Sequence, residues 1–333
     1  MNDRAVIPLA LAGIVGIAIA MALAINWGKT PDQLAARKAP PISARKSGVT
    51  ADQPDLAYGA FQRGYYLTAF AEAIPRAEKG DRAAQTLLGL LYASGLGIAQ
   101  SYKEAAAWYS LAAAAGDREA QFALGALYRD GDGVTKDVAT AADYFAKAAD
   151  AGQADAALAL AQIYLGGEGP GGNEERSADE EKAAALLSRA VGLGSVEAMA
   201  GLAELYDTGR GVPLDRGVAT RWFRTAAEKG LVVAQVQFAI RLANGIGTAK
   251  DEKRAAQWFR TAAETGSVQA QTRLARLYAA GLGVESDAIE AAKWYLLAKS
   301  SGGSDPWLDD FVERLPPDKR VAAADAAQRW PMP

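Results

Sequence analysis

Seven glycines organise this chain of 333 residues, because they recur at nearly constant intervals. They stand at Gly80, Gly116, Gly152, Gly194, Gly230, Gly266 and Gly302. The successive intervals are 36, 36, 42, 36, 36 and 36 residues, so the third unit carries six extra residues. A fixed period of this length is typical of repeat proteins, in which each unit packs on its neighbours instead of joining one central core.

Each unit has the pattern of two helices joined by a tight turn. The first segment is apolar at helical spacing, as in Ala84, Leu88 and Leu91, and a Gly-x-Gly follows it. These glycines let the chain reverse through φ values that other residues avoid. We expect the second helix to open on an N-cap residue and to end at the next unit glycine. The expected N-caps are Ser101, Asp137, Asp179, Asp215, Asp251 and Asp287.

Bulky pairs in the second helices are expected to fill the space between neighbouring units. They are Trp108-Tyr109, Tyr144-Phe145, Leu186-Leu187, Trp222-Phe223, Trp258-Phe259 and Trp294-Tyr295. Small residues such as Ala112 and Ala148 let the helices approach one another closely. Since one hairpin cannot bury its own apolar face, the units must stack into an all-α solenoid of helix-turn-helix repeats.

The shared pattern A-x-x-x-L-G/A-x-L-Y-x-x-G-x-G, followed by D-x-x-x-A-x-x-W-Y/F and A-A-x-x-G, resembles the Sel-one-like repeat family, which is tetratricopeptide-like. The resemblance implies a right-handed α-α superhelical solenoid. The six units are residues 80–115, 116–151, 152–193, 194–229, 230–265 and 266–302. Two units depart from the pattern. The third has a Gly- and Glu-rich loop and Leu186-Leu187, and the fifth has Arg241-Leu242 where Leu-Tyr is usual.

The segments that flank the repeats have distinct compositions. Residues 58–79 look like the second helix of a degenerate N-terminal repeat, and residues 303–333 are expected to form capping helices broken at Pro316-Pro317. Residues 28–57 contain four prolines among small and charged residues, which predicts a flexible linker.

Residues 1–27 are expected to form a transmembrane anchor or a signal segment. The run from Ala5 to Trp27 has no charged side chain, and at 1.5 Å per residue it covers about 30 Å, the thickness of a bilayer core. Its length favours an uncleaved anchor. The alternative is a signal peptide cleaved after Ala22-Leu23-Ala24, which would release a periplasmic form.

The orientation in the membrane is open. The charges that flank the run slightly favour a cytoplasmic repeat domain. Bacterial proteins similar to this one are often exported, and the resemblance therefore favours a single-pass protein of the inner membrane with periplasmic repeats.

The composition excludes much of enzyme chemistry. The chain has no histidine and no cysteine, so it offers no imidazole base, thiolate nucleophile, disulfide or thiolate–imidazole zinc site. Its net charge of −3 argues against nucleic-acid binding. We expect no catalytic residues, no metal and no cofactor, and we predict that the protein is not an enzyme.

Two acidic groups remain to be explained. Asp130, Asp132 and Asp137 begin like a calcium loop, but Ala141 stands where the EF-hand pattern has glutamate, which indicates an ordinary repeat turn. The insertion within residues 166–182 is expected to be a solvated loop, with weak cation binding as the alternative. Its acids between residues 174 and 181 are Glu174, Glu175, Asp179, Glu180 and Glu181.

The resemblance implies that the protein binds partner proteins or extended peptides on the concave face of the solenoid, as a scaffold or adaptor. First helices should line this face, with a solvent stripe at the third, seventh, tenth and fourteenth residues after each unit glycine. The stripe runs from apolar residues such as Leu87 and Ala126 to acidic and then basic ones. The predicted partner-binding residues are Glu197, Glu204, Gln237, Arg273 and Arg276. The alternative is an ordinary solvated helix face.

A second functional hypothesis is a cell-envelope protein that binds or hydrolyses glycans such as peptidoglycan. It requires converging carboxylates and exposed aromatic rings. Only Trp27, Trp307 and Trp330 lie outside the expected repeat packing.

Overall fold

The computed structural model describes residues 55–167 and 176–330. Within these ranges the secondary structure consists of α-helices, with no β-strand. None of these helices combines the length and the apolar character needed to cross a membrane. The expected membrane segment, residues 5–27, and residues 28–54 of the expected linker lie outside the described ranges.

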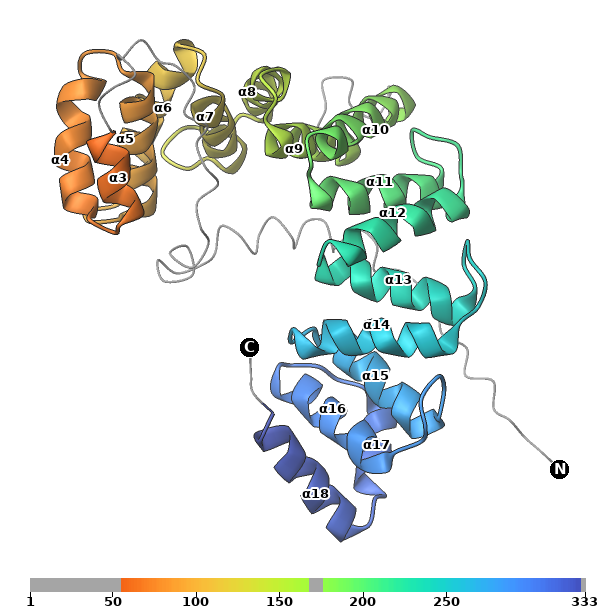
Figure 1. The fold of residues 1–333 in the computed structure, drawn as a ribbon. Helices are drawn as coiled ribbons and strands as arrows, with labels where there is room; N and C mark the ends of the chain where they lie inside the picture. Colours follow the sequence, from red (N-terminus) through yellow and green to blue (C-terminus); the bar gives the residue numbers. More distant parts are fainter. Residues whose placement is uncertain (1–54, 168–175, 331–333) are drawn as a thin grey trace. The chain divides into compact units, whose positions relative to one another are not determined.

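The chain divides into two compact units, of which the first ends at Ser101. Its helices are α3 (Leu56–Gln62), α4 (Tyr66–Ala77) and α5 (Arg82–Ser94), and each packs on the next (Figure 1). The prediction of a single helix over residues 58–79 was wrong. Gly64 adopts a φ of +80° and ends α3, so that α4 begins as a separate helix two residues later.

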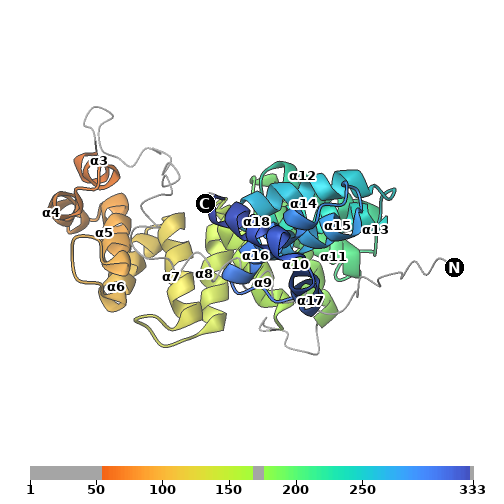
Figure 2. The ribbon, with the colours of Figure 1, turned by 90° about the horizontal axis from the view of Figure 1, so that it is seen from below.

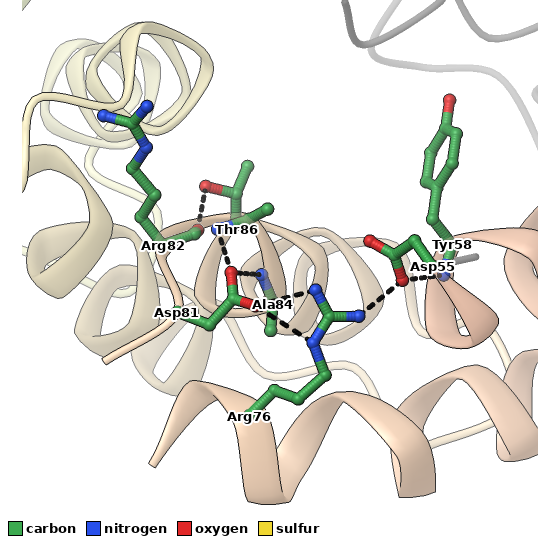
Figure 3. A network of polar contacts seen from close by, with 8 residues as sticks. Asp55, Tyr58, Arg76, Asp81, Arg82, Ala84 and Thr86 are labelled. Carbon is green, nitrogen blue, oxygen red and sulfur yellow. Dashed lines mark hydrogen bonds and ion pairs between the residues drawn. The ribbon is translucent and has the colours of Figure 1, made fainter. Parts of the chain in front are cut away.

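One arginine joins the three helices of this unit (Figure 3). Asp55 and Asp81 are the N-caps of α3 and α5, and Arg76 of α4 donates to both carboxylates. Its Nη1 lies 2.6 Å from Asp55 Oδ1, and its Nη2 lies 2.7 Å from Asp81 Oδ2. The hydrogen bond to Asp55 is the largest cause that raises the pKa of Arg76. Because both carboxylates also cap helices, we assign this network a structural role.

The second unit begins at Tyr102 and consists of thirteen helices within the described residues. Successive helices from α6 to α16 pack against one another in chain order, and α18 lies against α16 (Figures 1 and 2). Their bounds are α6 Tyr102–Ala114, α7 Arg118–Asp130, α8 Val138–Asp150, α9 Ala154–Leu165, α10 Arg176–Gly192, α11 Val196–Thr208, α12 Arg216–Glu228, α13 Val232–Asn244, α14 Glu252–Glu264, α15 Val268–Ala280, α16 Ala288–Ser300, α17 Pro306–Glu313 and α18 Pro317–Gln328.

The helix ends largely follow the sequence signals. The seven unit glycines all have φ between +80° and +95°, which confirms that each ends a second helix in the left-handed region. Asp137, Asp215, Asp251 and Asp287 cap α8, α12, α14 and α16 as expected. The N-cap expected at Asp179 is wrong: α10 already begins at Arg176, and Asp179 is buried inside it beside Lys182.

The second glycine of the Gly-x-Gly has a role in packing between repeats at Gly247 and Gly283. A Cβ on Gly247 would lie 2.1 Å from the carbonyl oxygen of Arg216, in the first turn of α12. At Gly283, a Cβ would come equally close, 2.1 Å, to the carbonyl oxygen of Glu252 in α14. The turn after each of these first helices therefore rests on the preceding repeat, at a separation that excludes any side chain.

Alanines and bulky pairs form the core between the helices, as predicted. The second member of each pair is buried, and Phe145, Phe223 and Tyr295 are at most 2% exposed. The alanines expected to set the helix spacing are all 0% exposed: Ala112, Ala148, Ala190, Ala226, Ala262 and Ala298. The core is therefore a series of small layers between successive helices.

Candidate functional site

The predicted partner-binding residues lie on the first helices of three consecutive repeats, α11, α13 and α15. Glu197 and Glu204 are on α11, Gln237 is on α13, and Arg273 and Arg276 are on α15. Only Glu197 is exposed, whereas the other four side chains are half-buried. The predicted stripe is wrong at Leu87 and Ala126, which are 5% and 2% exposed and belong to the core.

An ion pair that sequence reasoning missed joins α13 to α11. Arg241 is 4% exposed, and its guanidinium forms a bidentate ion pair with the carboxylate of Asp207. The Nη1–Oδ1 distance is 3.0 Å and the Nη2–Oδ2 distance is 2.9 Å. The guanidinium carbon lies 4.6 Å from the centre of the Phe223 ring. Its Nε has no hydrogen-bond partner within the described part of the chain. The signal was present in the sequence, because a cation at a position that holds Leu or Ile in the other repeats requires a carboxylate on a neighbouring helix.

Glu204 lies close to this pair and has an unusual pKa. Burial, and then the negative charge of Asp207, raise its pKa to about 7, although Arg241 and Arg210 act in the opposite direction. No hydrogen bond or ion pair holds its carboxyl group among the residues that the structure describes. Glu204 is therefore a half-buried carboxyl group that changes its charge near neutral pH.

A second arginine connects α11 to the repeat before it. Arg210 follows α11, and its Nε donates to Glu180 Oε1 at 2.7 Å. Its Nη2 donates to the carbonyl oxygen of Leu165, at the end of α9, at 3.2 Å. Glu180, which the sequence placed in a solvated acidic insertion, is therefore partly used to hold α10 against the turn after α11.

Arg276 is already bound within the protein. Its Nε and Nη2 lie 2.7 and 2.8 Å from the two carboxylate oxygens of Asp305, and its guanidinium carbon lies 5.5 Å from the centre of the Trp307 ring. Asp305 also caps α17 through the backbone N–H groups of Trp307 and Leu308. Burial raises the pKa of Asp305, but the hydrogen bonds from Arg276 and from Leu308 outweigh this effect and leave the pKa below its usual value.

Arg273 differs from Arg276 because no carboxylate pairs with it within the described residues. Burial lowers the pKa of its guanidinium and the positive charge of Arg276 lowers it further, although the negative charge of Asp305 acts in the opposite direction. Arg273 is thus a partly desolvated cation one turn away from an arginine that is neutralised. On α11, α13 and α15 the structure therefore presents an unpaired acid, an amide and an unpaired cation.

Two acids of the calcium-loop candidate have structural partners. Asp130 pairs with Arg129 at 2.7 Å, and Asp137 caps α8, where the hydroxyl of Thr140 is the first cause that lowers its pKa. Glu174 and Glu175 lie outside the described residues. In the ranges that are described, no three acidic side chains are grouped closely enough to hold a metal ion.

The aromatic side chains outside the repeats pack locally. Trp307 is 42% exposed and stacks on Phe311, with ring centres 5.6 Å apart, while Trp330 packs edge-on against Trp294. Since Arg276 and Phe311 both lie against Trp307, this ring is already used in the contact between α15 and α17.

Two-helix units that repeat in chain order, joined by left-handed glycines and capped at the C-terminus by extra helices, define an all-helical repeat protein of the solenoid class. The chain belongs to the Sel1 repeat family. The family model, described as Sel1 repeat, matches residues 82–117, 118–153, 154–195, 196–231, 232–267 and 268–303. These units begin two residues after those marked by the glycines.

A solved structure of a related protein agrees with this assignment. The chain is similar to a Sel1 repeat protein from Oxalobacter formigenes, with 30% identity over 76% of this chain and 100% of that one, and a TM-score of 0.66. It is also similar to a protective antigen of uropathogenic Escherichia coli that displays an SLR fold, with 26% identity over 80% of this chain and 64% of the other, and a TM-score of 0.48. No curated protein matches the chain.

Proposed function

We propose that this Sel1 repeat protein is a membrane-anchored scaffold that binds a partner protein across the first helices α11, α13 and α15. The family is consistent with a role in protein–protein interaction. The observation that carries the proposal is a pair of half-buried ionisable side chains without an ion pair, Glu204 on α11 and Arg273 on α15, with Gln237 on the intervening first helix α13.

The physical argument concerns the hydration that these two groups have lost. A charge that is partly buried without a partner has given up part of its hydration and has gained no ion pair in return. A cation of the partner placed on Glu204, and an anion placed on Arg273, restore this loss. Ion pairs that are partly desolvated contribute more than exposed pairs, which are worth about 0–1 kcal/mol. The partner that fits best is a segment that carries a basic and an acidic side chain in succession.

The membrane anchor is supported by the uncharged run from Ala5 to Trp27. The inner membrane, with the repeats on the periplasmic side, is our proposed location. Reporter fusions at the C-terminus that are active only in the periplasm or only in the cytoplasm test it. Washing of membranes at high salt and high pH separates an anchored chain from a cleaved one.

The test of the binding face uses charge reversal in the full-length chain. A photo-crosslinking amino acid at Gln237 should capture a partner in cells, and Glu204→Lys together with Arg273→Glu should abolish this capture. The matched control reverses two exposed charges at the C-terminal ends of second helices, Glu264→Lys with Lys229→Glu, and should leave it intact.

Reversal of the two contacting charges in the captured partner should then restore binding. Capture that survives the Glu204 and Arg273 changes refutes the proposed face. Retention on purified peptidoglycan with no protein partner refutes the scaffold and favours the glycan hypothesis.

A further inference from the structure

A small cavity at the junction of the fourth and fifth repeats is lined by arginines. It lies where α12, α13 and α14 meet, and its volume is about 130 Å³. Arg221 and Arg224 of α12 and Arg254 of α14 line it, and Phe238 and Leu242 of α13 contribute apolar side chains. No acidic side chain lines this arginine pocket.

The next repeat junction provides an internal comparison. There, 36 residues further on, Arg260, Tyr278 and Glu290 occupy the places of Arg224, Leu242 and Arg254. Arg260 donates a hydrogen bond to the hydroxyl of Tyr278. That cavity is also lined by acidic side chains, Glu285, Asp287 and Glu290. The same position in the fold therefore has the opposite electrostatic character one repeat later.

Leu242 is the residue that separates the two junctions. Five of the six repeats carry tyrosine at this position, and the fifth repeat carries leucine. Without a phenol at position 242, Arg224 lacks the hydroxyl partner that Arg260 has, and it pairs instead with Glu228 on the surface, where both side chains are about half exposed (57% and 48%).

The remaining two arginines are also weakly neutralised. The carboxylate paired with Arg254 is that of Asp251, 4.0 Å away, which already caps α14. Arg221 has no ion pair among the described residues; its Nη1 lies 3.7 Å, and Asp215 Oδ1 lies 3.2 Å, from where a Cβ on Gly217 would stand. Three arginine side chains thus line an opening that no acidic side chain lines.

The size and charge of the pocket select the class of ligand. A volume of about 130 Å³ corresponds to roughly four water molecules, whereas pockets for drug-sized ligands occupy about 300–1,000 Å³. Guanidinium forks match the oxygens of phosphate, and three cations favour a dianion over a carboxylate. We propose that the arginine pocket binds the phosphoryl group of inorganic phosphate or of a small phosphate monoester. This site is separate from the proposed partner face and does not depend on it.

The first test is calorimetric titration of the full-length chain with inorganic phosphate at pH 8 and constant ionic strength, with sodium acetate as the comparison. We expect one phosphate site per chain and much weaker binding of acetate. Equal binding of acetate and phosphate, or no phosphate binding up to about 10 mM, overturns the proposal. Phenyl phosphate separates the two sources, because tighter binding than phosphate indicates a monoester and equal binding indicates recognition of the phosphoryl group alone.

Variants locate the site. Leu242→Tyr restores the residue that the other repeats carry, so it should fold, fill the pocket and weaken phosphate binding at least tenfold. Arg221→Gln and Arg254→Gln should each weaken it about tenfold, the loss expected for one charge-assisted hydrogen bond. Arg260→Gln, at the next junction, is the matched control and should leave binding unchanged. Binding that persists in Leu242→Tyr with an unchanged circular dichroism spectrum, or that is lost in Arg260→Gln, places the anion elsewhere and refutes the pocket.

Discussion

Replacement of Glu204 by glutamine should make the protein more stable at alkaline pH and leave its stability unchanged in acid. The pKa of Glu204 is about 7 in the folded chain, against a value of 4.5 for an unperturbed glutamate. Because the folded chain holds this proton more tightly than the unfolded chain does, the group lowers the free energy of unfolding as the pH rises from 4.5 to 7. Well above pH 7, Glu204 is charged in both states and the loss in the free energy of unfolding has reached its full value.

The magnitude follows from the difference in pKa. A difference of about 2.5 units corresponds to about 3.4 kcal/mol at 1.36 kcal/mol per unit. Solvent still reaches part of the carboxyl group and screens it, so we expect about 2–3 kcal/mol for the Gln variant relative to the natural chain at pH 8. Glutamine has the shape of the protonated acid and carries no charge, which is why the difference should vanish near pH 4.

The assay is urea denaturation of the full-length chain at pH 4, 6 and 8. Long repeat arrays can unfold in parts, so the comparison uses the transition reported by Trp222 and Trp258, which lie on α12 and α14, the two helices that flank α13. Glu197→Gln is the control, since this side chain is exposed on the same helix and should change stability by less than about 0.5 kcal/mol at each pH. A difference for Glu204→Gln that is the same at pH 4 and pH 8, or a variant less stable at pH 8, would show that Glu204 does not titrate near neutral pH.

Three further predictions concern the packing of the repeats. Asp207→Asn should destabilise the fold by about 3 kcal/mol, because it leaves the buried Arg241 without a counter-charge. Arg241→Leu, which introduces the usual residue of the family pattern, should cost less than about 1 kcal/mol. A double-mutant cycle in urea measures both costs, and equal costs contradict this account. Gly247→Ala should lower the free energy of unfolding by more than about 3 kcal/mol, since its Cβ would meet a carbonyl oxygen at 2.1 Å. Gly230→Ala, with open space around it and φ of +91°, should lower it by about 1 kcal/mol. Similar melting temperatures for the two variants contradict the close approach at Gly247. Asp305→Asn should lower the free energy of unfolding by about 2 kcal/mol at pH 7. Because the pKa of Asp305 is lowered in the folded chain, this loss should disappear as the pH falls below about 4. A loss of stability that persists in acid would assign the effect to packing.

The parts of the fold that could be predicted from the sequence are those set by neighbouring residues. A glycine with φ near +85° or an aspartate three residues before a free N–H acts within one turn, so the ends of α8, α12, α14 and α16 were predictable. The prediction failed where two local signals competed. Asp179 resembles an N-cap, but Arg176 lies within the same helix and extends it by a turn.

The candidate site was less predictable, because it depends on groups from different repeats. The sequence identified Glu204 and Arg273 as members of a helix face, yet it gave no indication that one lies near Asp207 and Arg241 and that the other lacks a counter-charge. Arg276 was placed in the same group, although Asp305, 29 residues away, neutralises it. Half-burial of a charge is a property of the packed helices, and no spacing within one helix contains it.

The amino-acid sequence by itself determined the number of repeats, the two helices within each and the turns between them, because the glycines, caps and apolar spacing act over a few residues. Only the tertiary structure decided what these elements do to one another. It showed that Gly247 is required by the first turn of α12, that Asp207 neutralises Arg241, and that Leu242 leaves a space among three arginines. The physical reason is that each of these effects depends on the distance between successive repeats, which is fixed by alanine-lined contacts across the whole array.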